Sequence, residues 1–145
     1  MKKLIVILIL AFTCSMVTAQ RLQGISELNE KYTTGLFRTE DAHFLVPEFE
    51  NAVGRWFNVF EYLQGKVPGL MVYTNRFRSH VVRYRSGQPA FYVDEMMVDA
   101  QTLGNIPMND IAFVKVFRPP FMGAPFGGSN GAIAVYTKEG DEELE

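Results

Sequence analysis

The sequence has 145 residues, a formal net charge of -2, a single cysteine and a hydrophobic content of 48%. This length fits one domain, and the hydrophobic content is sufficient to bury a core, so a wholly disordered chain is excluded. The near-neutral charge gives no general attraction to nucleic acid or to an anionic membrane. An outer-membrane barrel of about 22 strands is also excluded, because at about ten residues a strand it needs on the order of 220 residues.

The first nineteen residues have the order of an export signal. Lys2 and Lys3 precede the apolar run 4–12, and a small-residue cleavage pattern ends at Ala19. The run is too short to cross a bilayer as a mature helix, and a buried N-terminal strand is the less favoured alternative. We expect cleavage after Ala19, a mature chain without a transmembrane segment, and a location in the periplasm, either free or associated with the outer membrane.

The single cysteine, Cys14, lies inside this signal. Lipid attachment would favour Leu or Val three residues before the cysteine and a small residue just before it, whereas Ala11 and Thr13 occupy these positions. Lipidation is therefore a minor alternative. Cleavage after Ala19 leaves no cysteine, and hence no disulfide, thiolate metal site or cysteine nucleophile. Export without cysteines favours a bacterial envelope, and other secretory routes stay open.

Residues 20–55 are weakly patterned and are predicted to form an extended or partly ordered N-terminal arm with no assignable function. Within the arm, residues 25–32 are a candidate short helix with Ser26 as its cap. Residues 40–43 are typical of a turn. The compact domain is predicted to follow at 56–140 and to end in a solvated acidic tail, residues 141–145.

The domain pattern predicts an α+β fold with short helices and a small mixed sheet. A helix is expected after the N-cap Asn58 and should end at Gly65, and residues 102–106 suggest a second helical turn. A hairpin is expected with its tip at Asp94 and Glu95. The segment 111–117 is apolar on both faces, which predicts the central strand. Strands should centre on Val72, Val82, Tyr92, Val114 and Val135.

Several short motifs stand in a fixed order along this domain. They are Leu63-Gln64-Gly65-Lys66-Val67-Pro68-Gly69-Leu70, Arg83-Tyr84-Arg85-Ser86-Gly87, Phe91-Tyr92-Val93-Asp94-Glu95, Ile106-Pro107-Met108-Asn109-Asp110-Ile111, Val114-Lys115-Val116, Gly127-Gly128-Ser129-Asn130-Gly131 and Val135-Tyr136-Thr137-Lys138-Glu139-Gly140. In this order they resemble the plug domain of TonB-dependent outer-membrane receptors, especially the starch-utilisation type of nutrient importer. Each motif alone is weak, and the ordered set over about 80 residues is specific. The resemblance implies structural roles for Gly65, Gly69, Asp94, Gly127, Gly128 and Gly131.

The sequence also departs from the plug pattern. The glycine usual after the hairpin aspartate is Glu95, and residues 117–121 replace the importer pattern Leu-Lys-Asp. No clear TonB box, the short energising motif of true receptors, lies near Gln20. The resemblance therefore implies a plug-like domain without the β-barrel. It further implies a non-enzymatic binding or gating module that acts with an envelope or outer-membrane protein, with a glycan or another nutrient as a further ligand.

Two regions are candidate partner contacts. The basic strand with Arg83 and Arg85 could dock an anionic glycan, a lipopolysaccharide phosphate or an acidic partner, although a solvated strand face is the more favoured interpretation. The apolar loop with Phe121, Met122 and Phe126 would be a partner surface if it is exposed. Aromatic and Met residues at such a density are otherwise more often core or interface than a cofactor pocket.

Constellations that could support catalysis or metal binding are few. Asp94 and Glu95 with Asp99 could coordinate Ca²⁺ or act as an acid-base pair, but adjacent carboxylates at a hairpin tip point apart, and a turn is favoured. His43 and His80 lack metal-site spacing, and no nucleophile elbow or phosphate-binding loop exists. We expect no catalytic, metal or cofactor site. Three classes remain: a plug-related binding or gating module, a structural domain of an envelope assembly without a transport role, and, least supported, a small exported enzyme.

Overall fold

The computed structural model describes residues 23–39, 41–50, 54–76, 79–85, 87–122 and 130–138. The chain divides into two compact units, Met1–Thr33 and Thr34–Glu145, and each is described by itself. Within the described residues, no helix is long and apolar enough to cross a membrane.

The first unit is helical over residues 23–32. The Thr33 hydroxyl, just after the helix, donates a hydrogen bond to the side-chain oxygen of Asn29 (2.9 Å). The helix predicted over 25–32 is therefore confirmed. The prediction that Ser26 caps it is wrong, because Ser26 already lies inside the helix and a cap must precede the first helical residue.

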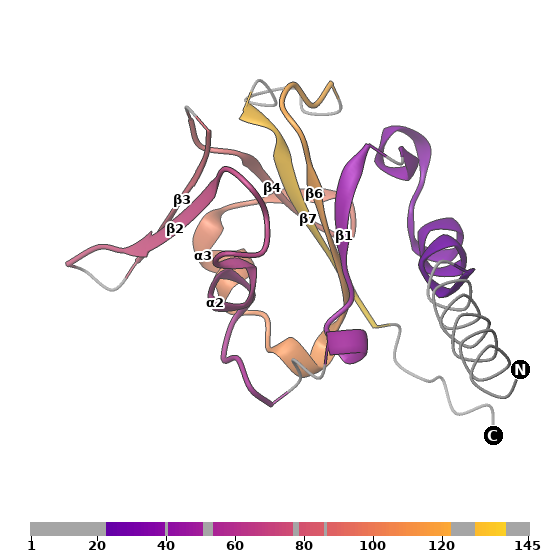
Figure 1. Cartoon of the computed structure of the whole chain (residues 1–145), viewed down its shortest axis with the longest axis horizontal. Coiled ribbons are helices and arrows are strands. Elements are labelled where there is room, and N and C mark those ends of the chain that lie inside the picture. The colour runs from indigo at the N-terminus through magenta and orange to yellow at the C-terminus, as the bar shows by residue number, and fades with distance from the viewer. Residues whose placement is uncertain are drawn as a thin grey trace, which may run out of the picture. The chain divides into compact units, whose positions relative to one another are not determined.

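The second unit is an α+β domain with two sheets (Figure 1). A five-stranded mixed sheet has the order β1-β6-β7-β4-β5, and β2 and β3 pair as a separate two-stranded ribbon. The pair β4–β7 is parallel and the other pairs are antiparallel. The predicted fold class is thus confirmed. The elements are η1 (Gly35–Arg38), β1 (Ala42–Leu45), η2 (Glu48–Glu50), α2 (Val59–Leu63), β2 (Leu70–Thr74), β3 (His80–Tyr84), β4 (Ala90–Val93), β5 (Met96–Val98), α3 (Ala100–Gly104), η3 (Met108–Asp110), β6 (Ile111–Phe117) and β7 (Ala132–Thr137).

The middle of the sheet is formed by the two most apolar strands of the sequence. Every residue of β6 is buried, and so are the first five residues of β7. Strand β6 is internal because β1 pairs with its outer side, with Leu45 opposite Val114. The predicted central strand is therefore internal but not central, since β7 holds the middle position. All five predicted strand centres lie in strands.

One face of the sheet packs against the two short helices. Val114 and Ile133 of the sheet share a buried core with Phe60 of α2 and Leu103 of α3. The side chain of Asn58 caps α2 by accepting the N–H of Glu61 (2.9 Å), as predicted. Helix α3 begins at Ala100, two residues before the predicted turn, because the Asp99 carboxylate accepts the N–H of Thr102 (2.6 Å) and caps it there.

An aromatic layer covers the opposite face. The ring of Phe37 lies 5.0 Å from the ring of Tyr92 and 5.8 Å from that of Phe117, both edge-on. Phe44 in β1 stacks on Phe113 at 5.6 Å. The fully buried Lys115 places its ammonium over the rings of Phe44 and Phe117 and donates to the carbonyl of Phe37. These contacts give the arm residues Phe37 and Phe44 a structural function.

The turn predicted over residues 40–43 is wrong, because Ala42–Leu45 is strand β1. The segment is only four residues long, and each residue is partly exposed, so no strict alternation marks it. Its ladder with β6 spans more than 70 residues of sequence, His43 lying opposite Val116. A local pattern cannot reveal such a pairing.

We expect the stability of the domain to depend on pH through His43 in strand β1. Burial, followed by the nearby Arg118, lowers the pKa of His43, and Asp41 opposes this in part. The folded state therefore favours the neutral imidazole, so stability is full above the unfolded pKa and falls as pH drops through the folded pKa. We expect urea midpoints to fall between about pH 7.5 and about pH 5.5 and to fall less in His43→Gln. An equal fall in both proteins would assign the effect to other groups.

Candidate functional site

The predicted hairpin tip forms hydrogen bonds to two segments that are distant in the sequence. Asp94 and Glu95 both have positive φ, 46° and 66°, and connect β4 to β5 as the sequence predicts. Asp94 accepts the N–H (2.9 Å) and the hydroxyl (2.7 Å) of Thr137. Glu95 accepts the N–H (2.6 Å) and the hydroxyl of Thr34. Both carboxylates therefore accept hydrogen bonds from backbone and hydroxyl groups. This arrangement agrees with the interpretation of the pair as a turn. Among the described residues, no three His, Cys, Asp or Glu side chains cluster as metal ligands.

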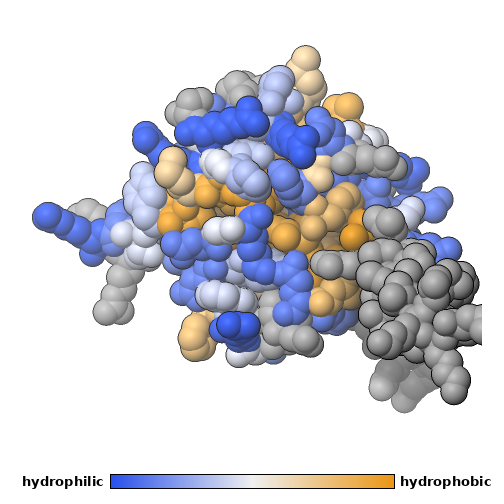
Figure 2. Space-filling view, viewed as in Figure 1, coloured by the Kyte–Doolittle hydropathy of each residue, from blue (hydrophilic) through white to orange (hydrophobic). Residues whose placement is uncertain are grey.

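The ribbon presents one face to the core and one to the surface. Leu70, Val82 and Tyr84 are buried. The alternate positions form what we call the ribbon outer face: Met71, Tyr73, Val81 and Arg83. Met71 lies opposite Arg83 and Tyr73 opposite Val81, so these side chains are cross-strand neighbours. In Figure 1 the ribbon projects away from the five-stranded sheet, and Figure 2 shows hydrophilic residues at its far end.

Arginines add positive charge to this projection. Arg76, Arg83 and Arg85 are exposed. The ion pairs found between described residues are Lys66–Glu50, Arg118–Asp41 and Lys138–Glu48, so none of these three arginines has an acidic partner in the described part of the chain. The predicted pair Arg83 and Arg85 therefore lies at an accessible, positively charged position. Whether it binds a partner stays a prediction.

The predicted apolar loop is described as far as Met122. Met122 is 85% exposed, whereas Phe121 is only 7% exposed. The ring of Phe121 packs on Phe117 at 4.4 Å and on Phe37 at 5.3 Å. Phe121 is therefore part of the aromatic layer, which is the core alternative for this residue and which composition alone does not reveal. Phe126, Gly127 and Gly128 lie outside the described residues, and the partner contact stays a prediction.

The predicted structural glycines that are described have the left-handed backbone that favours glycine. Gly65, Gly69 and Gly131 have φ of 77°, 82° and 82°. A Cβ at Gly65 would have no neighbour within 4 Å, whereas a Cβ at Gly131 would lie 2.5 Å from the carbonyl oxygen of Phe117. Glycine is thus favoured at position 65 by the backbone conformation alone. At position 131 it is favoured by the backbone conformation and by the lack of space for a Cβ.

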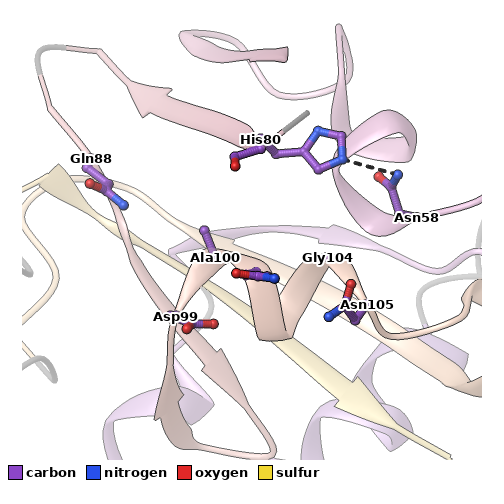
Figure 3. A pocket seen from close by; sticks show the side chains of 9 residues that line it. Asn58, His80, Gln88, Asp99, Ala100, Gly104 and Asn105 are labelled. Atoms are coloured by element: carbon purple, nitrogen blue, oxygen red, sulfur yellow. Dashed lines mark hydrogen bonds between the residues drawn. The ribbon is translucent and has the colours of Figure 1, made fainter. Parts of the chain in front are cut away.

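A polar hollow that the sequence did not indicate lies between the ribbon and α3. Its volume is about 590 Å³, and its walls come from the cap of α2, the start of β3, the segment before β4, and α3 (Figure 3). Four carboxamides dominate the lining: Asn58, Gln88, Gln101 and Asn105. Among the described residues that line it, His80 and Asp99 are the ionisable ones, and none of them is Lys or Arg. The hydrogen bonds between Asp99 and Thr102 lower the pKa of Asp99, which keeps this carboxylate charged at neutral pH.

The capping bond of α2 orients the Asn58 amide that faces the histidine in this hollow. The Asn58 side-chain oxygen is occupied by the N–H of Glu61, so its amide nitrogen faces Nε2 of His80 at 3.4 Å (Figure 3). The ring packs on Phe60, with the ring centres 5.3 Å apart. His80 is thus held in place by its neighbours.

The one local signal for this hollow was the pair of capping residues. Asn58 and Asp99 each begin a short helix, and capping side chains lie at helix ends, where several polar groups gather. Their proximity depends on how α3 contacts both β3 and β4. The hollow therefore could not be predicted before the tertiary packing was known.

Comparison with solved structures finds a similar fold in parts of an importer and of two receptors. The chain resembles part of the RagAB peptide importer in its closed-closed state, with a TM-score of 0.57 and 21% identity over 74% of this chain and 13% of that one. It resembles part of the ferric enterobactin receptor PfeA from Pseudomonas aeruginosa, with a TM-score of 0.56 and 15% identity over 70% and 18%. It also resembles part of the siderophore receptor PirA from Acinetobacter baumannii, with a TM-score of 0.56 and 14% identity over 74% of this chain and 19% of that one.

These three proteins are TonB-dependent receptors, and the similarity is consistent with a plug-like domain. Because the identities are low, the similarity shows the fold. The chain spans 13–19% of the length of these solved chains. No family model and no curated protein matches the chain.

Proposed function

We propose that this protein is a non-enzymatic, plug-like module that works by contact with another protein in an outer-membrane nutrient-uptake or envelope complex. The observation that carries the proposal is the fold similarity to plug-like parts of importers and receptors over about three quarters of the chain, 74% for RagAB. The ordered plug motifs of the sequence support it independently, because they depend on residue identity and not on the three-dimensional fold.

The contact regions proposed are the ribbon outer face with Arg85 and the exposed end of the 118–122 loop. Arg83 offers a planar, permanently charged group suited to a carboxylate. Met71 and Tyr73, 55% and 48% exposed, lie beside it and supply apolar area. Met122 supplies a flexible apolar side chain at the second region. The partner proposed is therefore an envelope protein with an acidic surface flanked by apolar residues. Export through a signal cleaved after Ala19 belongs to this proposal, and residues 1–22 lie outside the described part.

Crosslinking in native envelopes tests this proposal. The wild-type protein, Arg83→Glu and Arg55→Glu would be produced at native level, crosslinked and recovered by pull-down. We expect Arg83→Glu to reduce the crosslinked partner by about tenfold, since like charges across an interface are unfavourable. Arg55 is also exposed but lies outside the two regions, so Arg55→Glu, with the same charge change, should leave recovery unchanged.

The identity of the recovered partner separates the two classes of function. A partner that imports nutrients supports the plug-like role, and a partner without a transport role supports a structural domain of an envelope assembly. Recovery of the protein only as a free monomer with turnover of a substrate would contradict both. An equal loss with Arg55→Glu would show that net charge, and not the ribbon, governs the contact.

A further inference from the structure

Methionine side chains make up much of the apolar surface. Methionine is ordinarily among the residues that are most often buried. Here, four of the eight large hydrophobic side chains that are exposed in the described part are methionines, and they are between 53% and 85% exposed. They are Met71, Met96, Met97 and Met122, whereas Met108 is only 3% exposed. Four methionine side chains are therefore accessible to a dissolved reagent, and the core shields the fifth.

These thioethers carry the sulfur chemistry of the expected mature chain. The single cysteine, Cys14, precedes the cleavage point expected after Ala19. After residue 19 the sequence holds sulfur only in methionines. A thioether is neutral and polarizable, and its characteristic reaction is oxidation to the sulfoxide. An oxidant that attacks sulfur therefore has the exposed methionines as its targets.

Met71 differs from the other exposed methionines in its neighbour. It lies directly opposite Arg83 in the β2–β3 ladder, and both side chains belong to the ribbon outer face. Directly opposite side chains have Cβ atoms about 4.5–5.5 Å apart, which brings two long side chains within reach of each other. Arg83 has no acidic partner in the described part of the chain. Its guanidinium can therefore turn to a new acceptor on Met71 without breaking an ion pair.

The other exposed methionines have different surroundings. Strand β5, which carries two of them, lies opposite apolar and aromatic residues of β4. Met122 lines a small hollow together with Arg118, whose guanidinium is already paired with Asp41 (3.1 Å). Met71 is thus the exposed methionine whose cross-strand neighbour is a cation without an acidic partner in the described part.

Hydrogen peroxide is the oxidant of the reaction considered for this side chain. A lone pair of the thioether sulfur attacks one peroxide oxygen, the O–O bond breaks and an S–O bond forms. Sulfur loses two electrons, and the released hydroxide takes the proton of the transferred oxygen and leaves as water. The product is a polar sulfoxide in place of an apolar side chain, and its oxygen accepts hydrogen bonds.

We propose that Met71 is a sulfoxide modification site that switches off the ribbon outer face. The sulfoxide oxygen accepts a hydrogen bond from the guanidinium of Arg83, so it competes with the partner carboxylate for the same donors. Oxidation also makes the apolar flank of this arginine polar. A methionine sulfoxide reductase reverses the change. The effect on partner binding rests on the function proposed above, whereas the oxidation and the contact with Arg83 do not.

Peptide mapping by mass spectrometry, applied to the full chain after treatment with hydrogen peroxide, tests the modification. We expect Met71 to be oxidised at least about tenfold faster than Met108, because oxidation follows exposure. The Nε–H signal of Arg83 should shift in the NMR spectrum of the oxidised protein and stay in place in oxidised Met71→Leu, which keeps an apolar side chain and lacks the sulfur. Oxidation of Met71 no faster than that of Met108, or an unmoved Arg83 signal, would overturn the proposal.

Crosslinking tests the switch, with purified protein that is freed of peroxide and then added to native envelopes. Oxidised wild type should recover about tenfold less partner than untreated protein, and oxidised Met122→Leu should lose as much. Oxidised Met71→Leu should keep its partner, and treatment with methionine sulfoxide reductase should restore recovery by the oxidised wild type. An equal loss in oxidised Met71→Leu would assign the effect to other groups and contradict the switch.

The outcomes distinguish a failure of this proposal from a failure of the proposed function. If untreated wild type captures no partner, the contact proposed above is wrong, and the Arg83 signal still decides whether the sulfoxide engages the arginine. If untreated protein captures a partner and oxidation leaves the capture unchanged, the contact stands and the switch is wrong.

Discussion

Gly131→Ala should unfold at a temperature on the order of 15 °C below the wild type, corresponding to a loss of about 3 kcal/mol or more. Gly131 precedes β7 with φ of 82°, a conformation that alanine adopts only at a cost. Its Cβ would lie 2.5 Å from the carbonyl oxygen of Phe117 and 2.9 Å from the ring of Tyr84. Both neighbours are fully or almost fully buried, so neither can move away without disturbing the core.

Gly65→Ala is the matched control for this prediction. Gly65 has φ of 77°, close to that of Gly131, but its Cβ would meet nothing within 4 Å. It should therefore lose only the backbone contribution, about 1 kcal/mol. Thermal and urea unfolding of both variants, followed by circular dichroism, measure the difference. Equal losses of unfolding free energy would mean that backbone conformation alone matters at Gly131. The neighbours Phe117 and Tyr84 would then move aside for a Cβ at little cost.

Local patterns were sufficient for most of the fold. The strands around Val82 and Val135 could be predicted because an apolar or alternating run ends at a turn signal, which are both local properties. The cap of α2 could be predicted because Asn58 lies three residues before Glu61. The hairpin at Asp94 needs only the two short strands on either side of it. In each case the residues that decide the structure lie within a few positions of each other.

The features that escaped prediction depend on contacts between distant segments. Lys115 interrupts an apolar strand and would be expected at the surface, yet it is fully buried, because Phe37 and Phe44 come from the arm to provide a carbonyl and a ring. A buried cation requires such partners. Phe121 is buried by the same layer. The sequence pattern gave the arm no function, so neither burial could follow from it.

The candidate site was predictable only where its residues carry a local signal. The charge of Arg83 and its place on a strand are visible in the sequence, and its exposed position agrees with the expected alternation. The polar hollow is different, because Gln88, Gln101 and Asn105 meet only when α3 packs beside β3. Single carboxamides in loops and short helices carry no signal of their own.

The aromatic layer also predicts how far the arm belongs to the folding unit. Phe37→Ala should cost about 2–3 kcal/mol, toward the low end for a truncated aromatic residue because Phe37 is partly exposed. It removes the ring that contacts Tyr92, Phe117 and Phe121 at 5.0, 5.8 and 5.3 Å. It leaves the carbonyl that accepts from Lys115, since that group is backbone.

Leu36→Ala is the control for this change, because Leu36 is the preceding residue of η1 and is 61% exposed. An exposed side chain has little buried apolar area to lose, so its truncation should change the free energy of unfolding by less than about 0.5 kcal/mol. If the arm folds together with the sheet, Phe37→Ala lowers the midpoint of one cooperative transition and raises hydrogen exchange throughout β1 and β6. If the arm opens by itself, only the β1 amides exchange faster and the global midpoint stays close to that of Leu36→Ala. That second outcome would contradict the cooperative layer, because rings that stabilise the core of β6 cannot be removed without a global cost.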